Sequence, residues 1–318
     1  MTNEKPLVSV IMITYNEKEY ISQALDSVLS QKVDFPYEIL IGDDASTDGT
    51  QVILKKYAEK YRKKIRLFVR TKNLGPSRNA YELLIRAKGK YTATCEGDDY
   101  WIDPLKLQKQ VDILEENPSL VGCAHKFTIV DESGKTIEGK SLPWVHAKKV
   151  FRLNDFKGIY MPGQPSTFMR RNLVTQYHED ISVMYKIDGF VSDRTLMMLS
   201  LFHGNYTCLD DTMSCYRKST AGTSVTAKLY RKNTDAILKD YNITCSLEIL
   251  AEGHGHKLRF SRFKKILFSK ACALLLLRAD RSFGAVAYYM WKKAHFDITY
   301  PLYMPAYLLS RCIPVHLW

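Results

Sequence analysis

The sequence predicts an α/β fold with a mostly parallel sheet flanked by helices, followed by a helical, basic C-terminal region. Short apolar runs rich in β-branched residues recur along residues 7–94, and a segment with helical spacing follows each of the first three. This alternation is typical of right-handed βαβ units with parallel strands. Residues 254–318 contain eleven Lys or Arg residues against two Asp, a net charge of +9 out of +12 for the chain. We therefore expect one domain over residues 1–222 and a separate basic region over residues 223–318.

Four strands buried on both faces are predicted in the first part of the chain, because their runs are continuously apolar rather than alternating. They are Leu7–Thr14, Tyr37–Gly42, Ile65–Val69 and Lys90–Thr94. Helices are expected between them, around residues 21–29, 50–61 and 80–87.

Polar loops follow three of these strands, at Thr14–Asn16, Asp43–Asp44 and Glu96–Asp99. The carboxyl ends of parallel strands share one edge of the sheet, and ligands bind there. The carboxylates of the last loop repel one another, which is energetically unfavourable. A divalent cation bound by their oxygens would remove this repulsion. The alternative is a solvated acidic turn. Since neither a GxGxxG nor a GxxxxGK[ST] motif is present, a bound phosphate has to be held by metal and side chains.

Four motifs in this order make the chain similar to a known family. They are Val8–Glu17, Ile41–Thr50, Asn73–Gly75 with Arg78–Asn79, and Glu96–Asp99. Together they resemble the family 2 glycosyltransferases, inverting enzymes with the Rossmann-like GT-A fold. The resemblance covers residues 1–120 and implies a nucleotide-binding half there, with an acceptor half over residues 121–222.

The resemblance also implies roles for residues at the first two strand ends. Thr14, Tyr15 and Glu17 would line the nucleotide pocket, with Tyr15 near the base. Asp43 or Asp44 would accept a hydrogen bond from the base, and the sequence leaves open which of the two does so.

Further along, Arg78 would reach the nucleotide, or else it is a solvated arginine at a helix start. Asp98 and Asp99 occupy the DxD-type position of the family. Asp99 is the expected ligand of Mn²⁺ or Mg²⁺, and Asp98 is expected near the ribose or sugar, or as a second metal ligand. Glu96 stands where many relatives have Asp.

Asp193 precedes a predicted helix over residues 195–202. In related enzymes a carboxylate at this helix start takes the proton of the acceptor, so Asp193 is the expected general base and Asp188 the second choice. The alternative for Asp193 is a helix-capping carboxylate stabilised by the helix dipole. The chemistry requires a base because a hydroxyl is a poor nucleophile.

The acceptor half has weaker patterns. A helix is predicted from Asp103 to Asn117, followed by a hairpin of residues 121–130 and 135–137 and by a loop over the acceptor site at residues 138–163. A strand lining the sugar site is expected at residues 164–170, and further strands at residues 206–210 and 213–219. Ser219 replaces the histidine of the family's Tyr-Arg-x-His pattern.

The basic region is expected to hold a helix over residues 224–250 and a break at Gly253–His256. Residues 257–318 combine Lys and Arg with aromatic side chains, which favours an anionic membrane surface as partner. The alternative is a helical appendage packed on the domain. Seven scattered cysteines without a CxxC pair, no signal peptide and no spanning apolar run predict a cytoplasmic protein, peripheral on the inner face of the cell membrane.

These features predict a metal-dependent glycosyltransferase of the hexosyltransferase type. It would move a sugar from a nucleotide-sugar, a UDP-sugar by preference, to a hydroxyl of a glycan or lipid-linked glycan in surface polysaccharide synthesis. One alternative is a polyprenyl-phosphate sugar synthase, whose anionic acceptor needs little help from a base such as Asp193. Another is a non-enzymatic basic nucleic-acid-binding module, but the acidic strand ends would repel phosphates, so no nucleic acid is expected.

Overall fold

The computed structural model describes residues 5–218, 233–278 and 281–293. They form two compact units. The first holds residues 5–156 and 160–218, and the second holds residues 157–159 with the described residues from 233 on. The boundary expected between residues 222 and 223 lies outside the described residues.

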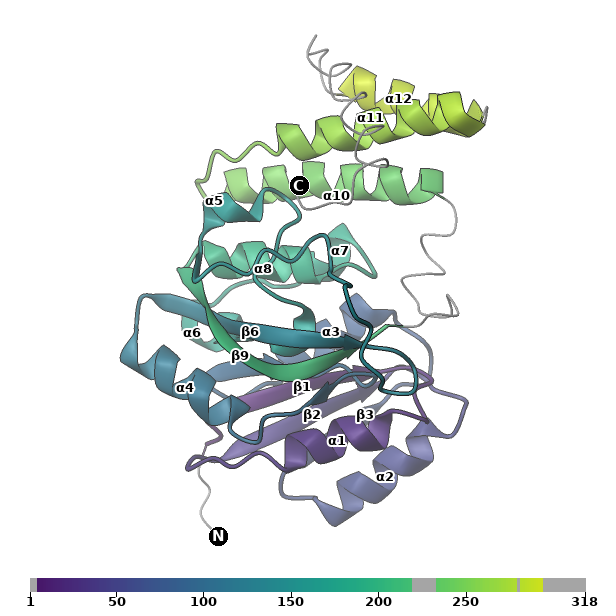
Figure 1. The fold of residues 1–318 in the computed structure, drawn as a ribbon. Helices are drawn as coiled ribbons and strands as arrows, with labels where there is room; N and C mark the ends of the chain where they lie inside the picture. The colour runs from purple at the N-terminus through teal and green to yellow at the C-terminus, as the bar shows by residue number, and fades with distance from the viewer. Residues whose placement is uncertain (1–4, 219–232, 279–280, 294–318) are drawn as a thin grey trace. The chain divides into compact units, whose positions relative to one another are not determined.

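A mixed sheet forms the centre of the first unit (Figure 1). Its strands are β1 Val8–Thr14, β2 Tyr37–Asp43, β3 Ile65–Val69, β4 Tyr91–Thr94, β5 Tyr100–Trp101, β6 Leu120–Val130, β7 Val150–Phe151, β8 Met169–Arg171 and β9 Asn205–Arg217. They are ordered β3-β2-β1-β4-β8-β6-β9-β5, with β7 beside β9. The first four strands run parallel, and β8 is antiparallel to both β4 and β6. The predicted α/β sheet is confirmed.

Helices cover both faces of this sheet. They are α1 Ile21–Leu29, α2 Thr50–Lys60, α3 Pro76–Leu84, α4 Lys106–Glu116, α5 Leu153–Phe156, α6 Leu173–Tyr177, α7 Val183–Ile187 and α8 Asp193–Leu201, with a short 3₁₀ helix η1 at Pro165–Thr167. Val10 and Met12 of β1 join a core that includes residues of α1, α2 and α4, whereas Ile11 joins a core with Leu83 of α3. Because side chains alternate along a strand, β1 is buried on both faces, as its apolar run predicts.

The third helix begins at Pro76 rather than Ala80 and ends at Leu84 rather than Ala87. Gly75 precedes it with a φ of 84°, a conformation that glycine adopts without strain. Proline is well suited to the first helical position, where its missing N–H leaves no bond unmade. The prediction missed this start.

The predicted hairpin is present, but its second arm is short. Residues 121–130 lie in β6, and the return segment pairs with it through an antiparallel bridge from Val130 to Thr136. The Ile137 amide donates to the Ile129 carbonyl and the Asp131 amide to the Lys135 carbonyl, both at 2.9 Å. The main partner of β6 is β9, which runs parallel to it over nearly its full length.

Two further strand predictions change. The strands expected at residues 206–210 and 213–219 are one strand, β9, which ends at Arg217, and residue 219 lies outside the described residues. Its register jumps from the pair His125–Leu209 to the pair Lys126–Thr212, so the two acidic residues between form a bulge rather than a chain break. The strand expected at residues 164–170 begins instead with η1, because Pro165 has no N–H to give to a ladder.

The second unit is helical, with α10 Asn233–Gly253, α11 Ser261–Arg278 and α12 Arg281–Lys293. Ile237 and Tyr241 of α10, Leu267 of α11 and Met290 of α12 meet in its core. α10 ends at Gly253, the expected break, whereas the first part of the helix predicted at residues 224–250 lies outside the described residues. None of the described helices has the length and apolarity that a membrane span requires.

Candidate active site

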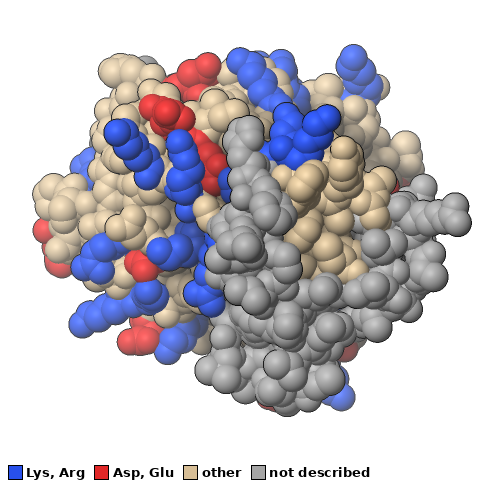
Figure 2. Space-filling model, turned by 90° about the horizontal axis from the view of Figure 1, so that it is seen from above, with Lys and Arg blue, Asp and Glu red and all other residues tan. Residues whose placement is uncertain are grey.

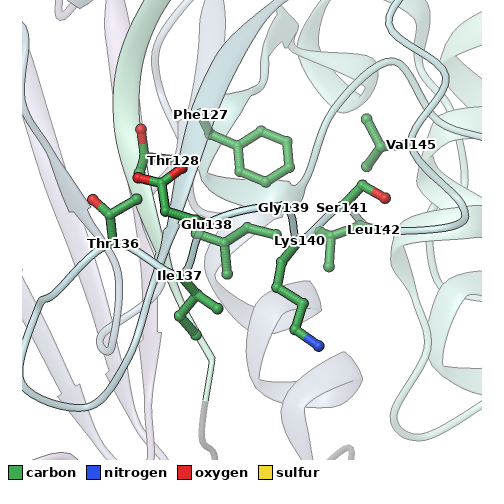
Figure 3. Close-up of a pocket in the computed structure, with 11 residues that line it drawn as sticks. Phe127, Thr128, Thr136, Ile137, Glu138, Gly139, Lys140, Ser141, Leu142 and Val145 are labelled. Carbon is green, nitrogen blue, oxygen red and sulfur yellow. The ribbon is translucent and has the colours of Figure 1, made fainter.

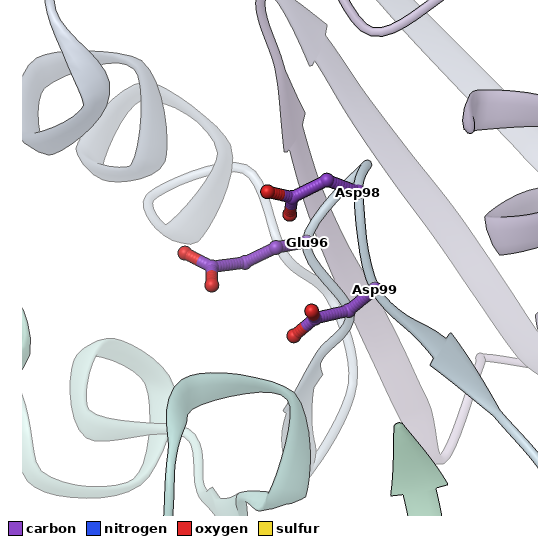
Figure 4. Close-up of side chains that lie close together, drawn as sticks. All are labelled: Glu96, Asp98 and Asp99. Atoms are coloured by element: carbon purple, nitrogen blue, oxygen red, sulfur yellow. The ribbon is translucent and has the colours of Figure 1, made fainter. Parts of the chain in front are cut away.

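Three carboxylates gather in the turn between β4 and β5. Glu96, Asp98 and Asp99 each place an oxygen within 4.8 Å of the other two, and their side chains point to the same side of the turn (Figure 4). Burial raises the pKa of all three groups, and repulsion between the carboxylates adds to the rise at Glu96 and Asp99. Divalent hard cations prefer such oxygen donors, so this acidic turn fits a metal site of the predicted kind.

Asp99 is held from two directions. The Ser166 hydroxyl donates a hydrogen bond of 2.6 Å to its Oδ2, and the Arg217 amide donates one of 2.9 Å to its Oδ1. The Ser166 Oγ also accepts the Glu96 amide at 3.0 Å, so η1 ties the acidic turn together. Asp99 is 1% exposed, and these bonds fix how its carboxylate faces the cluster. Ser166 belongs to the segment of residues 164–170 that was expected near the sugar, but its bonds to the acidic turn were not predicted, because they arise from contacts across the fold.

Arg217 braces the same turn through its side chain. Its guanidinium donates to the carbonyls of Asp98, Asp131 and Glu132 and to the Gln23 side chain, at 2.8 to 3.1 Å. These contacts give Arg217 a structural role beside the acidic turn. Ser219, which stands at the histidine position of the family pattern, lies outside the described residues.

A fourth carboxylate, Glu17, approaches the acidic turn from the loop after β1. A Cβ added at Gly97 would lie 2.1 Å from Glu17 Oε2 and 2.9 Å from Thr14 Cβ. The turn can therefore approach these two side chains closely only because residue 97 is a glycine. Burial and the nearby Asp98 raise the pKa of Glu17. Thr14 is buried beside it, and Tyr15, the next residue, is 41% exposed. Contact of these three residues with a nucleotide stays a prediction.

Asp43 and Asp44, at the end of β2, hold the surrounding loops. Asp43 Oδ2 accepts the Ser46 amide at 3.1 Å, while Asp44 accepts the amides of Leu74 and Gly75 at 2.7 and 2.9 Å. Both carboxylates are buried. Each thus shapes the expected nucleotide pocket, and hydrogen bonding of either one to a base stays a prediction.

Arg78 lies on the first turn of α3. Its guanidinium pairs with Glu82 at 3.0 Å and lies over the Tyr185 ring, 4.3 Å from the centroid. The side chain is 41% exposed. This geometry matches the alternative of a surface arginine, and a contact with the nucleotide stays a prediction.

Asp193 begins α8 and faces a cavity of about 60 Å³ that Glu96 and Arg170 also line. Burial raises the pKa of Asp193, and the Arg170 charge opposes that rise. Arg170 is 7% exposed, and its buried Nη1 has no hydrogen-bond partner among the described residues. The fold thus brings Asp193 to the acidic turn from a distant part of the chain. Arg170 ends the segment of residues 164–170 that was expected near the sugar, but no role was predicted for its side chain.

Asp188, the second choice for the base, has a different setting. Its Oδ1 accepts the amides of Phe190 and Val191 at 2.8 and 2.7 Å. These bonds shape the loop before α8, which is a structural task.

A family model described as Glycosyl transferase family 2 matches residues 9–177, more than half of the chain. The chain belongs to glycosyl transferase family 2. The resemblance is thereby confirmed. Membership makes the protein a glycosyltransferase and favours an enzyme over a nucleic-acid-binding module.

Relatives of this family 2 protein include an uncharacterized protein of Mycobacterium bovis. It is 33% identical over 260 residues, which cover 79% of this chain and 70% of the relative. TuaG of Bacillus subtilis, named as a teichuronic acid biosynthesis glycosyltransferase, is 41% identical over 128 residues, 40% of this chain and 48% of TuaG. The match therefore spans less than half of TuaG.

Solved structures of TarS from S. aureus share the fold. The 1–349 fragment in complex with UDP aligns with a TM-score of 0.57 and 22% identity, over 84% of this chain and 71% of the fragment. The complex with UDP-GlcNAc gives a TM-score of 0.58 and 20% identity, over 82% and 70% of the two chains. At these identities the likeness shows the fold, and the predicted GT-A architecture of this family 2 enzyme is confirmed.

Proposed function

We propose that this enzyme is a metal-dependent, inverting glycosyltransferase that moves a sugar from a UDP-sugar to a hydroxyl of a glycan or lipid-linked glycan. The observation that carries the proposal is that Asp193 faces the same cavity as Glu96 of the acidic turn. A candidate base and a candidate metal site thus lie together at the carboxyl ends of the strands. TarS binds UDP and UDP-GlcNAc, and TuaG is named for teichuronic acid biosynthesis, which supports a UDP-sugar and a surface polysaccharide as first choices.

In the proposed reaction, Asp193 takes the proton of the acceptor hydroxyl as the oxygen attacks the anomeric carbon. The bond from that carbon to the nucleotide diphosphate breaks, and the configuration inverts. Asp99, with Asp98, would hold Mn²⁺ or Mg²⁺, which when bound neutralises charge on the leaving diphosphate. Ser166 and the Arg217 amide keep Asp99 oriented for this task.

Release of the nucleotide from sugar donors tests the proposal. We expect one donor among UDP-, GDP- and dTDP-sugars to be hydrolysed slowly without acceptor, dependent on Mn²⁺ or Mg²⁺ and blocked by EDTA. Asp99→Asn should abolish this dependence together with the activity. Full metal-dependent activity of Asp99→Asn, or hydrolysis that EDTA does not affect, would contradict the proposal.

We also propose that the second unit docks on an anionic membrane surface from the cytoplasmic side. In α12, Val286, Ala287 and Met290 are buried in the helical core. Tyr288 is 61% exposed, and Lys292 and Lys293 are exposed at the end of the helix. On the face shown in Figure 2, Lys and Arg side chains cover more surface than Asp and Glu. Aromatic and basic side chains side by side suit the headgroup region, and such docking would bring the enzyme to a lipid-linked acceptor.

A further inference from the structure

A groove of about 400 Å³ lies beside the second half of β6. Phe127, Thr128 and Ile129 form one wall, and the segment of residues 136–145 forms the other (Figure 3). This volume falls in the range of about 300–1,000 Å³ that is usual for small-molecule sites. The roles proposed above for Asp99 and Asp193 use none of these residues.

Backbone hydrogen bonds hold both walls in place. The Ile137 amide donates to the Ile129 carbonyl, and the Val145 amide donates to the Leu142 carbonyl, both at 2.9 Å. Val145 also forms a bridge with Met161. The groove is therefore formed before any ligand arrives, which lowers the entropy cost of binding.

Tyr216 connects the groove with the acidic turn. Its ring meets the Phe127 ring edge to face, 6.4 Å between centroids, and Tyr216 pairs with Ile129 across β6 and β9. The next residue of β9, Arg217, donates its amide to Asp99 Oδ1 at 2.9 Å, so the strand runs from the groove to the acidic turn. A ligand in the groove would sit beside the proposed reaction centre.

The side chains of the groove combine one aromatic ring with polar groups. Phe127 is half-buried, whereas Glu138, Lys140 and Ser141 are exposed on the opposite wall. A pyranose has C–H groups on its ring faces and hydroxyls around its edge, so it contacts an aromatic ring with one surface and hydrogen-bonds with the other. Glu138 and Lys140, the charged residues of this lining, have opposite charges. The lining therefore carries no net positive charge to offset the desolvation of an anionic sugar, which favours a neutral one.

We propose that this groove is the acceptor subsite and that it takes a neutral pyranose residue of the acceptor glycan against Phe127. The proposal rests on the glycosyltransferase function proposed above, because it names where the second substrate of that reaction binds. It leaves the donor contacts at the acidic turn unchanged.

Saturation-transfer difference NMR tests the groove with simple probes. The full-length protein, with UDP and diamagnetic Mg²⁺ present, is titrated with methyl β-D-glucopyranoside, methyl N-acetyl-β-D-glucosaminide and methyl β-D-glucuronide. We expect a neutral glycoside to bind more tightly than the glucuronide. Phe127→Ala should weaken this binding about tenfold, as loss of one aromatic contact predicts. Thr136→Trp should block the groove, and Lys56→Ala on α2 should change nothing.

UDP affinity and thermal stability are measured for each variant as a check on folding. If Thr136→Trp is unfolded, Lys140→Ala, an exposed change, replaces it and should weaken binding severalfold. Three results would overturn the subsite: neither neutral glycoside binds, the glucuronide binds more tightly than both, or the groove variants bind as tightly as the wild type. If the wild-type protein does not bind UDP at all, this would instead count against the proposed function.

Discussion

Ser166 illustrates how a residue without reaction chemistry of its own orients one that has it. Its hydroxyl bridges the Glu96 amide and the Asp99 carboxylate. Because groups that orient a ligand tune the affinity of a metal site, we expect Ser166→Ala to weaken Mn²⁺ binding about 10- to 100-fold. Electron paramagnetic resonance of free Mn²⁺ measures this directly. Ser166→Thr keeps the hydroxyl and should retain most of the affinity, whereas an unchanged affinity in Ser166→Ala would show that the bond does not matter for metal.

Asp193 and Asp188 lie near each other in sequence but have different surroundings. Asp193 faces the cavity with Glu96, whereas Asp188 accepts two backbone amides of its own loop. Loss of a general base typically costs about 10²- to 10⁴-fold in rate. We expect Asp193→Asn to lower the kcat of transfer by that factor with UDP affinity unchanged. Asp188→Asn, the matched control, should keep its kcat within a few-fold, and the opposite ranking of the two variants would refute the assignment of the base.

At the scale of the element, α4 carries a lysine that is buried in the core of the first unit. Lys106 is 0% exposed, donates to Gln110 Oε1 at 2.8 Å, and lies 4.0 Å from the Trp101 ring centroid. Burial lowers the pKa of Lys106 to about 7. An unfolded lysine keeps its proton to about pH 10, so between these values the unfolded state binds more protons than the folded state. The free energy of unfolding of the protein therefore rises with pH in this range, because the proton that the buried lysine loses on folding is released more easily at higher pH.

This linkage predicts that the unfolding midpoint of the wild-type protein rises from about pH 7 to about pH 9, and that Lys106→Met flattens the slope. Thermal unfolding followed by fluorescence at several pH values measures both. Lys109→Met on the same helix is a suitable control, because Lys109 is only half-buried and pairs with Asp103 and Asp211. Parallel pH profiles for wild type and Lys106→Met would show that Lys106 is not neutral in the folded state.

The strands of the nucleotide-binding half could be predicted because a strand buried on both faces needs apolar residues at nearly every position. The continuous apolar run of β1 is an example. The same reasoning failed on β9, where Asp210 and Asp211 suggest a chain break. There the partner strand β6 continues, and a bulge absorbs the two exposed residues. The decisive information lay in the neighbouring strand rather than in the local sequence.

The candidate site could be predicted in part for a related reason. Asp98, Asp99 and Asp193 belong to motifs with a recognisable spacing, and the fold brings Asp193 to the acidic turn. Ser166 and Arg170 have no such motif, since their positions depend on β8 lying next to β4 in the sheet. The contact of Glu17 with the acidic turn depends on the missing side chain of Gly97. Single-sequence patterns do not reach contacts of this kind.

At the scale of the whole molecule, the basic charge of the chain concentrates in its last part. If this charge docks the protein on anionic lipid, reversing two exposed lysines of α12 should reduce binding to phosphatidylserine vesicles at least about tenfold. The double variant Lys292→Glu/Lys293→Glu is compared with Lys55→Glu/Lys56→Glu on α2, which changes the net charge equally. Vesicle flotation measures both. Equal loss in the two variants, or no binding by the wild-type protein, would count against the membrane surface.

The central claim is that the acidic turn binds the nucleotide diphosphate through a divalent cation. Calorimetric titration of UDP into the full-length protein tests it most directly, once with Mn²⁺ and once with EDTA, for the wild type and for Asp99→Asn. We expect the wild type to bind UDP at least about tenfold more tightly with Mn²⁺ than with EDTA, as loss of a bridging charge predicts, and Asp99→Asn to bind equally weakly in both. Equal affinity of the wild type with Mn²⁺ and with EDTA would contradict the claim.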